Sequence, residues 1–202
     1  MRRARHHGDF TPEIVLSAYR IGFFPMAQSR AGAISWYSPD PRAVIPIEAF
    51  HVPRSLRTYM KRTPFSTTID AAFERVIRHC AEERDKEDTW ISDEIVDVYS
   101  RLHRGGAAHS VETWDGDRLL GGLYGLAIGG AFFGESMFSR AENASKVALV
   151  RLVSHLRHRG YVLLDTQIIN NHVQQFGAVE IPREEYLDRL IAAISLPIKF
   201  LD

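Results

Sequence analysis

Two polar residues at the end of an apolar segment are the first candidates for chemistry. Asp165 and Gln167 lie two residues apart in the segment 161–167, which is predicted to be a strand. Because side chains alternate along a strand, both are predicted to project to one face, with Thr166 on the other. A buried carboxylate and amide need polar partners, so they indicate either a ligand site or a structural polar network. From these residues alone, both interpretations stay open.

Glu135 is a third candidate, because it is acidic among apolar neighbours. It lies in the stretch 134–146, where a predicted strand leads into a predicted helix. Such a junction commonly holds functional groups. The alternative is that Glu135 is a solvated strand residue and that Asn143 serves only as the helix cap. Position alone favours this structural alternative.

Leucines at helical spacing could form the apolar wall of a pocket. Leu149, Leu152 and Leu156 recur every three or four residues and share one face of a predicted helix. An ordinary core stripe has the same pattern and is favoured by spacing alone. The middle strand of the predicted sheet holds three glycines, Gly121, Gly122 and Gly125. They either permit close approach of backbone or ligand, or accommodate a bulge or a bend.

Other common chemistries find little support in the sequence. The chain has nine histidines, but His155 and His158 have no acidic or cysteine ligand at a recognisable spacing, so no metal site is predicted. No phosphate-binding Walker pattern and no nucleophile elbow is present. Cys80 lies within a predicted helix without an evident activating base. Phosphoryl transfer and cysteine hydrolysis are therefore disfavoured.

The elements that must position these residues follow from caps and periodicity. Helices are predicted over 11–22, 53–62, 70–80, 92–105, 143–160 and 183–194. An antiparallel meander is predicted over 109–138, and a further strand over 161–167. Residues 23–42, rich in proline and aromatic side chains, are predicted to form an ordered, turn-rich connection. The pattern predicts an α+β fold in which a helix covers one sheet face.

Charge points to a local surface. The 25 basic and 25 acidic residues balance, so net charge gives no argument for a nucleic-acid partner. The predicted helix at 53–62 nevertheless carries Arg54, Arg57, Lys61 and Arg62 at spacings of three and four. These positions gather on one side and form a basic stripe.

The cellular compartment is inferred from cysteine content and apolar runs. The single cysteine, Cys80, excludes an internal disulfide framework and fits a reducing compartment. The basic start of the chain is followed by Gly8, Asp9 and Pro12 instead of an apolar run, so no secretion signal is expected. No uninterrupted apolar stretch is long enough to span a membrane. We expect a cytoplasmic monomer with no membrane partner.

Several blocks together resemble the leucyl/phenylalanyl-tRNA protein transferase family, and they occur in the family's order. The blocks are 24–25, 36–42, 89–91, 109–112, 121–125, 134–146, 164–167, 170–172 and 177–183. They extend over roughly residues 11 to 194. Accidental similarity is far less expected over such separated blocks than for one short motif.

The resemblance implies a fold and a reaction. It implies a small N-terminal α/β lobe over 1–50 and a catalytic domain with the acetyltransferase-like (GNAT) fold over 51–202, without metal or organic cofactor. The α-amine of a protein beginning with Arg or Lys would attack the ester of Leu- or Phe-tRNA, which would mark that protein for degradation. The implied partners are the acceptor end of an aminoacyl-tRNA and proteins or peptides with basic N-termini.

The resemblance also implies roles for individual residues. Gln167 would bond the reacting amine or carbonyl, Asp165 would orient Gln167, and Glu135 would engage the aminoacyl end of the donor. Substrate contacts are implied for Met26, Trp90, Leu123, Phe132, Gly134, Met137, Leu149, Leu152, Leu156, Leu164 and Asn170. The residues implied to contact the tRNA acceptor end are Arg54, Arg57, Lys61 and Arg62.

Departures from the family pattern leave specificity open. Some relatives carry phenylalanine at the positions of Leu152 and Leu156 and tryptophan at that of Met26, so Leu, Phe and Met are alternative donors. The N-terminal lobe is shorter than in many relatives, which leaves basic and acidic acceptor termini as alternatives.

Two other functions remain as alternatives. An acyl-CoA N-acyltransferase on the same fold would need a glycine-rich pyrophosphate loop where this chain has residues 141–145. A non-catalytic tRNA-binding module would keep the basic stripe but would not need Glu135, Asp165 and Gln167 together.

Overall fold

A computed structural model describes the backbone of residues 2–5 and all atoms of residues 10–82 and 89–202. Residues 6–9, whose polarity argued against a secretion signal, lie outside this described part. The helices are α1 (Pro12–Arg20), α2 (Arg54–Met60), α3 (Phe73–Glu82), α4 (Asp93–Arg104), α5 (Ala144–Arg159), α6 (Asn171–Gln174) and α7 (Arg183–Ile194). Within the described residues, none of them is long and apolar enough to cross a membrane.

The strands form two sheets. Their bounds are β1 (Arg2–Arg5), β2 (Phe24–Ala27), β3 (Ile34–Ser38), β4 (Arg42–Ile45), β5 (Ser66–Ile69), β6 (Ala108–Asp115), β7 (Arg118–Ile128), β8 (Ala131–Ser139), β9 (Leu163–Gln167) and β10 (Val179–Ile181). One sheet has three strands in the order β1-β3-β2, and the other has seven in the order β10-β4-β9-β8-β7-β6-β5. The predicted α+β class is confirmed.

The three-stranded sheet corrects the prediction for residues 23–42. The expected turn-rich connection instead contains β2 and β3, which pair antiparallel. Pro25, which suggested a break, lies on β2 and pairs with Trp36 of β3. Strand β2 is an edge strand of this sheet. Proline is tolerated on an edge strand because it needs to donate no ladder hydrogen bond there.

The seven-stranded sheet contains the predicted meander as β6, β7 and β8, all antiparallel. Strand β9 pairs parallel with β8 after the crossover through α5. Strand β4 pairs with β9 and β10 pairs with β4, both antiparallel. These two strands and β5 were not predicted. Strand β4 lies before residue 50 yet belongs to this large sheet, and the division into 1–50 and 51–202 stays a prediction.

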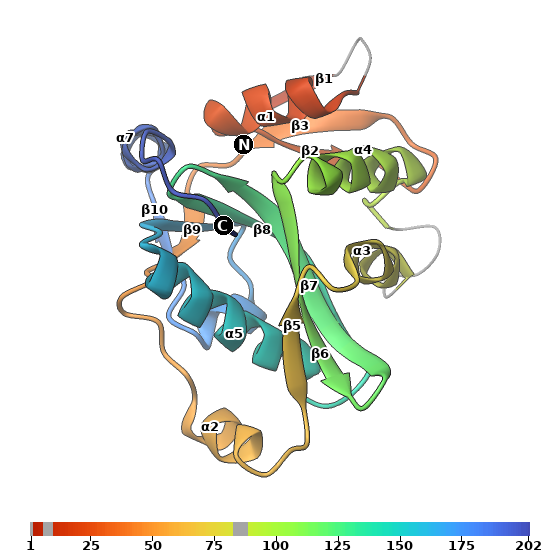
Figure 1. The fold of residues 1–202 in the computed structure, drawn as a ribbon. Coiled ribbons are helices and arrows are strands. Elements are labelled where there is room, and N and C mark those ends of the chain that lie inside the picture. The colour runs from red at the N-terminus through yellow and green to blue at the C-terminus, as the bar shows by residue number, and fades with distance from the viewer. Residues whose placement is uncertain (1, 6–9, 83–88) are drawn as a thin grey trace.

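Helices cover both faces of the large sheet (Figure 1). Helix α5 packs across β5 to β8 on one face, and α3 and α4 pack on the other. The buried side chains accordingly divide into two clusters, one that contains the apolar faces of α1, α3 and α4 and one beneath α5. Helix α1 and the three-stranded sheet lie at the end of the molecule opposite α2. The large sheet therefore lies between two helical layers.

Helix caps were predicted correctly where the cap is local. The side chains of Thr11 and Ser92 accept from the backbone N–H of Ile14 (3.4 Å) and Ile95 (3.2 Å), as expected. Asn143 was predicted to cap α5, but its side chain makes no capping bond.

Two helix starts use side chains that lie on strands of the large sheet. At α5, Ser139 Oγ accepts from Ser145 N at 3.2 Å. Helix α3 begins at Phe73 instead of the predicted Asp70, and the carboxylate of Glu112 on β6 accepts from the backbone N–H of Ala72 at its start (3.3 Å).

The glycines of β7 serve packing. A Cβ on Gly121 would lie 2.6 Å from the Cβ of Ala144, so this glycine lets the first turn of α5 approach the sheet closely. At Gly125 the β7–β8 register shifts by one residue, and a Cβ there would lie 2.2 Å from the backbone oxygen of Phe133. The structure thus supports the backbone-approach and bulge interpretations of these positions.

Candidate active site

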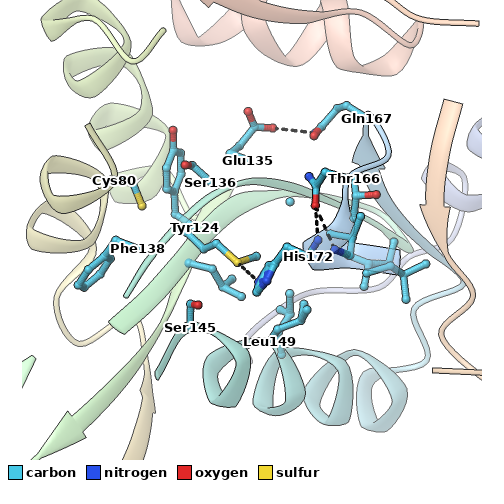
Figure 2. Close-up of a pocket in the computed structure, with 18 of the residues that line it drawn as sticks. Cys80, Tyr124, Glu135, Ser136, Phe138, Ser145, Leu149, Thr166, Gln167 and His172 are labelled. Carbon is cyan, nitrogen blue, oxygen red and sulfur yellow. Dashed lines mark hydrogen bonds between the residues drawn. The ribbon is translucent and has the colours of Figure 1, made fainter. Parts of the chain in front are cut away.

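A pocket opens where the two parallel strands separate. Strands β8 and β9 pair from Ala131 and Leu163 to Phe133 and Asp165, and beyond these residues β8 continues unpaired with β9 to Ser139. The space beside this separation is a cavity of about 680 Å³. Its walls come from β7, β8, β9, α5 and α6. Figure 2 shows Glu135 and Gln167 at one end and Leu149 of α5 at the other.

Glu135 reaches the pocket because of a β-bulge. Gly125 pairs with Gly134 and Tyr124 pairs with Ser136, so Glu135 is an extra residue on β8 that faces no partner on β7. A bulge of this kind bends the strand and turns a side chain away from regular alternation. Glu135 Oε1 accepts from the hydroxyl of Tyr19 on α1 at 2.7 Å.

Asp165 is enclosed by donors. Its carboxylate is fully buried and receives two bonds from the guanidinium of Arg42, Nε to Oδ1 at 2.9 Å and Nη2 to Oδ2 at 2.6 Å. The Tyr186 hydroxyl of α7 donates to Oδ2 at 2.7 Å. Burial lowers the pKa of Arg42, but the adjacent Asp165, together with Tyr186 and Tyr19, outweighs this effect and holds that pKa above its ordinary value. The pair is therefore an ion pair.

Gln167 lies at the end of β9 with left-handed backbone geometry. Its φ is 59°, and its backbone N–H donates to Asp165 Oδ1 at 2.9 Å. Its side-chain nitrogen donates to Glu135 Oε1 at 3.4 Å (Figure 2). Gln167 borders the pocket together with Thr166, whereas Asp165 does not border it. Asp165 and Gln167 are both buried, whereas Thr166 between them is partly exposed, and their common face stays a prediction because the positive φ of Gln167 departs from regular strand geometry.

The hydroxyls around Glu135 form a chain. The hydroxyls of Tyr19 and Tyr99 lie 2.7 Å apart, and Tyr19 also contacts Glu135. Burial raises the pKa of Glu135 to about 8, opposed by the bond from Tyr19 and increased by Asp165. Burial and the nearby Glu135 charge raise the pKa of both tyrosines well above the ordinary value. The two tyrosines therefore stay protonated donors. Of these three hydrogen-bonded groups, Glu135 is the one that titrates near neutral pH.

The predicted substrate contacts divide into two groups. Those bordering the pocket are Leu123, Gly134, Met137, Leu149, Leu152, Leu164 and Asn170. We call Leu123, Met137, Leu149, Leu152 and Leu164 the apolar chamber. Phe132 and Leu156 are fully buried beside it in the cluster under α5. Met26 and Trp90 pack against the other cluster. The substrate contacts of all eleven residues stay a prediction.

Several neighbours of the site were missed from the sequence. Tyr19 and Tyr99 lie on apolar helix faces, where a tyrosine resembles ordinary core. Arg42 is the last residue of the block 36–42 that resembles the family. Nothing near it in the sequence indicated that it would be buried against Asp165. Tyr186 belongs to the last predicted helix. Fully buried polar groups at these positions are the signal, but it becomes visible only when the fold is known.

The predicted basic stripe is exposed. Arg54 and Arg57 belong to α2, and Lys61 and Arg62 follow it. All four side chains are exposed to solvent. The guanidinium of Arg57 donates to the backbone oxygen of Val52 at 3.4 Å, which holds it near the start of the helix. Within the described part of the chain, no group of three His, Cys, Asp or Glu side chains could hold a metal ion.

The fold and site together define an α+β protein with a pocket where two parallel strands separate, in which an apolar chamber lies next to a carboxyl–amide pair. Residues 44–191 match the family model described as leucyl/phenylalanyl-tRNA protein transferase, and residues 8–40 match the model for that family's N-terminal domain. The chain belongs to the leucyl/phenylalanyl-tRNA protein transferase family, which confirms the resemblance seen in the sequence.

The relatives cover nearly the whole chain. A leucyl/phenylalanyl-tRNA–protein transferase of Gloeobacter violaceus is 53% identical over 94% of this chain and 97% of its own length. One of Chlorobaculum tepidum is 51% identical over 94% of this chain and 98% of its own. Among solved structures, L-PGS from Bacillus licheniformis matches 79% of this chain and 53% of its own with a TM-score of 0.48 and 9% identity. That likeness is too weak to assign a fold.

The buried ion pair yields a prediction on stability. Arg42→Met leaves the Asp165 carboxylate buried without its partner, so the free energy of unfolding should fall by about 3–5 kcal/mol. The matched control is Arg189→Met, which removes a half-exposed pair with Glu185 and should cost less than about 1 kcal/mol. Urea unfolding measures both. Equal costs for the two variants would contradict the role given to the buried pair.

Proposed function

We propose that this chain transfers an aminoacyl group from an aminoacyl-tRNA to the α-amine at the N-terminus of a protein. The carrying observation is the hydrogen-bonded chain from Tyr19 through Glu135 to Gln167 at the polar end of the pocket. Next to it lies the apolar chamber, which suits the side chain of Leu, Phe or Met. Membership in the family supports the same reaction.

The finer features belong to the same proposal. Acceptors begin with Arg or Lys, transfer marks them for degradation, and the enzyme acts as a cytoplasmic monomer without a cofactor. Residues 51–202 adopt the acetyltransferase-like (GNAT) architecture. The antiparallel β6–β8 meander, followed by α5 and by β9 parallel to β8, supports this assignment.

The reaction replaces an ester bond by a peptide bond. The acceptor amine attacks the ester carbonyl, a C–N bond forms, the C–O bond to the ribose breaks, and the ribose oxygen leaves with a proton. The ester is already activated, so positioning supplies much of the rate, with effective molarities of roughly 10⁵ to 10⁸ M for well-oriented reactions. The pocket must therefore hold the amine and the carbonyl at attack distance.

Gln167 and Glu135 have different roles at the acceptor amine: Gln167 orients it and Glu135 accepts its proton. The nitrogen of the Gln167 amide donates to Glu135, which leaves its carbonyl oxygen to accept from the acceptor amine. Gln167 has no useful basicity, so it orients the amine and does not keep its proton. Glu135, with a pKa of about 8, is matched to an α-amine whose reference pKa is also about 8. Glu135 takes the proton as the C–N bond forms.

The geometry disfavours the acyl-CoA alternative. Pyrophosphate binding needs open backbone N–H groups at the start of a helix. At the start of α5, Ala144 N donates to Ala141 O at 3.1 Å and Ser145 N donates to Ser139 Oγ at 3.2 Å. Two N–H groups that would face a phosphate are thus already bonded within the chain.

A transfer assay tests the proposal directly. We expect labelled Leu-, Phe- or Met-tRNA to pass its amino acid to peptides that begin with Arg or Lys, and less to peptides that begin with Asp, Glu or Ala. In single turnover, Asp165→Ala and Gln167→Ala should each lose most of the transfer while tRNA binding remains. Binding of tRNA without transfer by the wild type would instead support the non-catalytic module. Near-wild-type transfer by folded variants would contradict the proposed pair.

The pKa of Glu135 gives a pH prediction. Below pH 8 both Glu135 and the acceptor amine gain protons, and transfer needs both groups unprotonated. Well below pH 8 the logarithm of the transfer rate should therefore rise by almost two for each pH unit. Glu135→Gln should transfer about 10²- to 10⁴-fold more slowly, and its slope should be close to one because only the amine still titrates. Single-turnover rates between pH 6 and 9 measure this. An unchanged slope in the variant would rule out Glu135 as the titrating group.

The basic stripe gives a salt prediction. Arg57→Glu combined with Lys61→Glu should weaken tRNA binding and flatten the dependence of log K on log salt by about one to two, because each lost phosphate contact removes about 0.7–0.9 from the slope. Arg20→Glu is the control, since Arg20 is exposed on α1 at the opposite end of the molecule (Figure 1). Fluorescence anisotropy with labelled tRNA measures the slopes. An unaltered slope in the double variant would count against this surface.

A further inference from the structure

His172 borders the pocket from α6 and takes no part in the chain from Tyr19 to Gln167. Its Nε2 lies 2.7 Å from the sulfur of Met137, which borders the same pocket from β8 (Figure 2). Met137 pairs across the sheet with Leu123, another member of the apolar chamber. The contact therefore joins a wall of the chamber to a short helix outside the sheet.

The imidazole is held in place by its own surroundings. The Asn170 side-chain oxygen accepts from the backbone N–H of His172 at 2.9 Å and of Val173 at 3.1 Å, which fixes the start of α6. The His172 ring packs edge-on against Phe176, with 5.9 Å between centroids and 84° between planes. Phe176 in turn stacks on Phe50 at 5.3 Å. The ring is thus the rigid member of the contact.

Met137 is the adaptable member. A methionine side chain has three rotatable bonds and a polarisable sulfur, so it fills spaces of different shapes. Burial lowers the pKa of His172, and Lys146 lowers it further, so the ring is neutral and carries a single N–H. With that hydrogen on Nε2, the ring donates to the weakly accepting sulfur and holds the thioether in one position.

We propose that His172 is a positioning residue that sets the donor preference of the pocket by holding Met137 in place. The inference rests on the proposed function, because it concerns the side chain that the aminoacyl-tRNA carries. With Met137 held, the chamber suits the short, branched side chain of leucine. With Met137 released, its thioether can rotate away and the longer ring of phenylalanine gains room. His172 therefore favours leucine over phenylalanine without contact with the reacting atoms.

The test compares His172→Gln with His172→Asn. Both are neutral amides, but the glutamine nitrogen reaches about as far as histidine Nε2, whereas the asparagine nitrogen ends one methylene short. We expect His172→Gln to keep the wild-type ratio of kcat/KM for Leu-tRNA to that for Phe-tRNA. His172→Asn should lower this ratio by about two- to ten-fold, the range expected for the loss of one hydrogen bond. Gln174→Ala, exposed on the same helix, is the matched control and should leave the ratio unchanged.

A second readout does not depend on catalysis. The methyl carbon of Met137 is labelled with ¹³C, and its NMR signal is identified because it disappears in Met137→Leu. NMR relaxation should show a well-ordered Met137 methyl group in the wild type and in His172→Gln. It should be mobile in His172→Asn. Thermal unfolding confirms that each variant remains folded.

The outcomes separate the inference from the function beneath it. If His172→Asn leaves the ratio unchanged or moves it towards leucine, or if the Met137 methyl group is equally ordered in both variants, the inference is overturned and the proposed function stands. If the wild type transfers neither leucine nor phenylalanine, the proposed function fails and the inference fails with it.

Discussion

The buried ion pair of Arg42 and Asp165 is the interaction on which the pocket depends. Burying each ion costs several kcal/mol of hydration, and only good geometry with further hydrogen bonds compensates for that cost. Here the guanidinium binds the carboxylate at two points, and Tyr186 donates a third bond to it. Arg42 also donates to the backbone oxygen of Gly22 at 3.0 Å and lies over the Phe24 ring, 5.0 Å from its centroid. Segments around α1, β2, β4, β9 and α7 therefore converge on one ion pair, which ties the N-terminal part of the chain to the strand that borders the pocket.

The pair also fixes the backbone of Gln167 at the polar end of the pocket. A left-handed φ at a residue other than glycine costs on the order of 1–3 kcal/mol and persists only when the surroundings enforce it. At Gln167 the enforcing contact is the bond from its backbone N–H to Asp165 Oδ1. Across the pocket, the bulge at Glu135 is the second departure from regular strand structure. Both departures bring an amide and a carboxyl group together from two strands whose pairing has already ended. Regular strands would not hold these two groups in contact at that point.

The parts of the fold that the sequence predicts correctly are those decided by near neighbours. The caps at Thr11 and Ser92, the helices and the β6–β8 meander each follow from residues a few positions apart. Strands β4 and β10 were missed because they are short and their pairing partners are distant in the sequence. The cap at α5 was assigned to Asn143, yet the bond comes from Ser139, a choice that depends on how β8 meets the helix. The role of Arg42 was also missed, because its partner Asp165 lies 123 positions further along the chain.

The two ends of the pocket answer different physical demands. Discrimination by an apolar chamber is limited to about 1–3 kcal/mol per methylene, so donor choice would rest on walls that keep their shape, which is the role proposed for the imidazole of His172 beside the thioether of Met137. Catalysis on an activated ester asks for less basicity than the hydrolysis of an amide would. A carboxyl of ordinary pKa would hold the amine proton poorly, whereas a much stronger base would have almost no unprotonated fraction at neutral pH. Burial of Glu135 beside Tyr19 raises its pKa to about 8, close to that of the amine it would serve. A general base whose pKa is near the working pH combines an available unprotonated form with a useful driving force, so the remaining rate would come from the positioning that the Arg42–Asp165 pair supports.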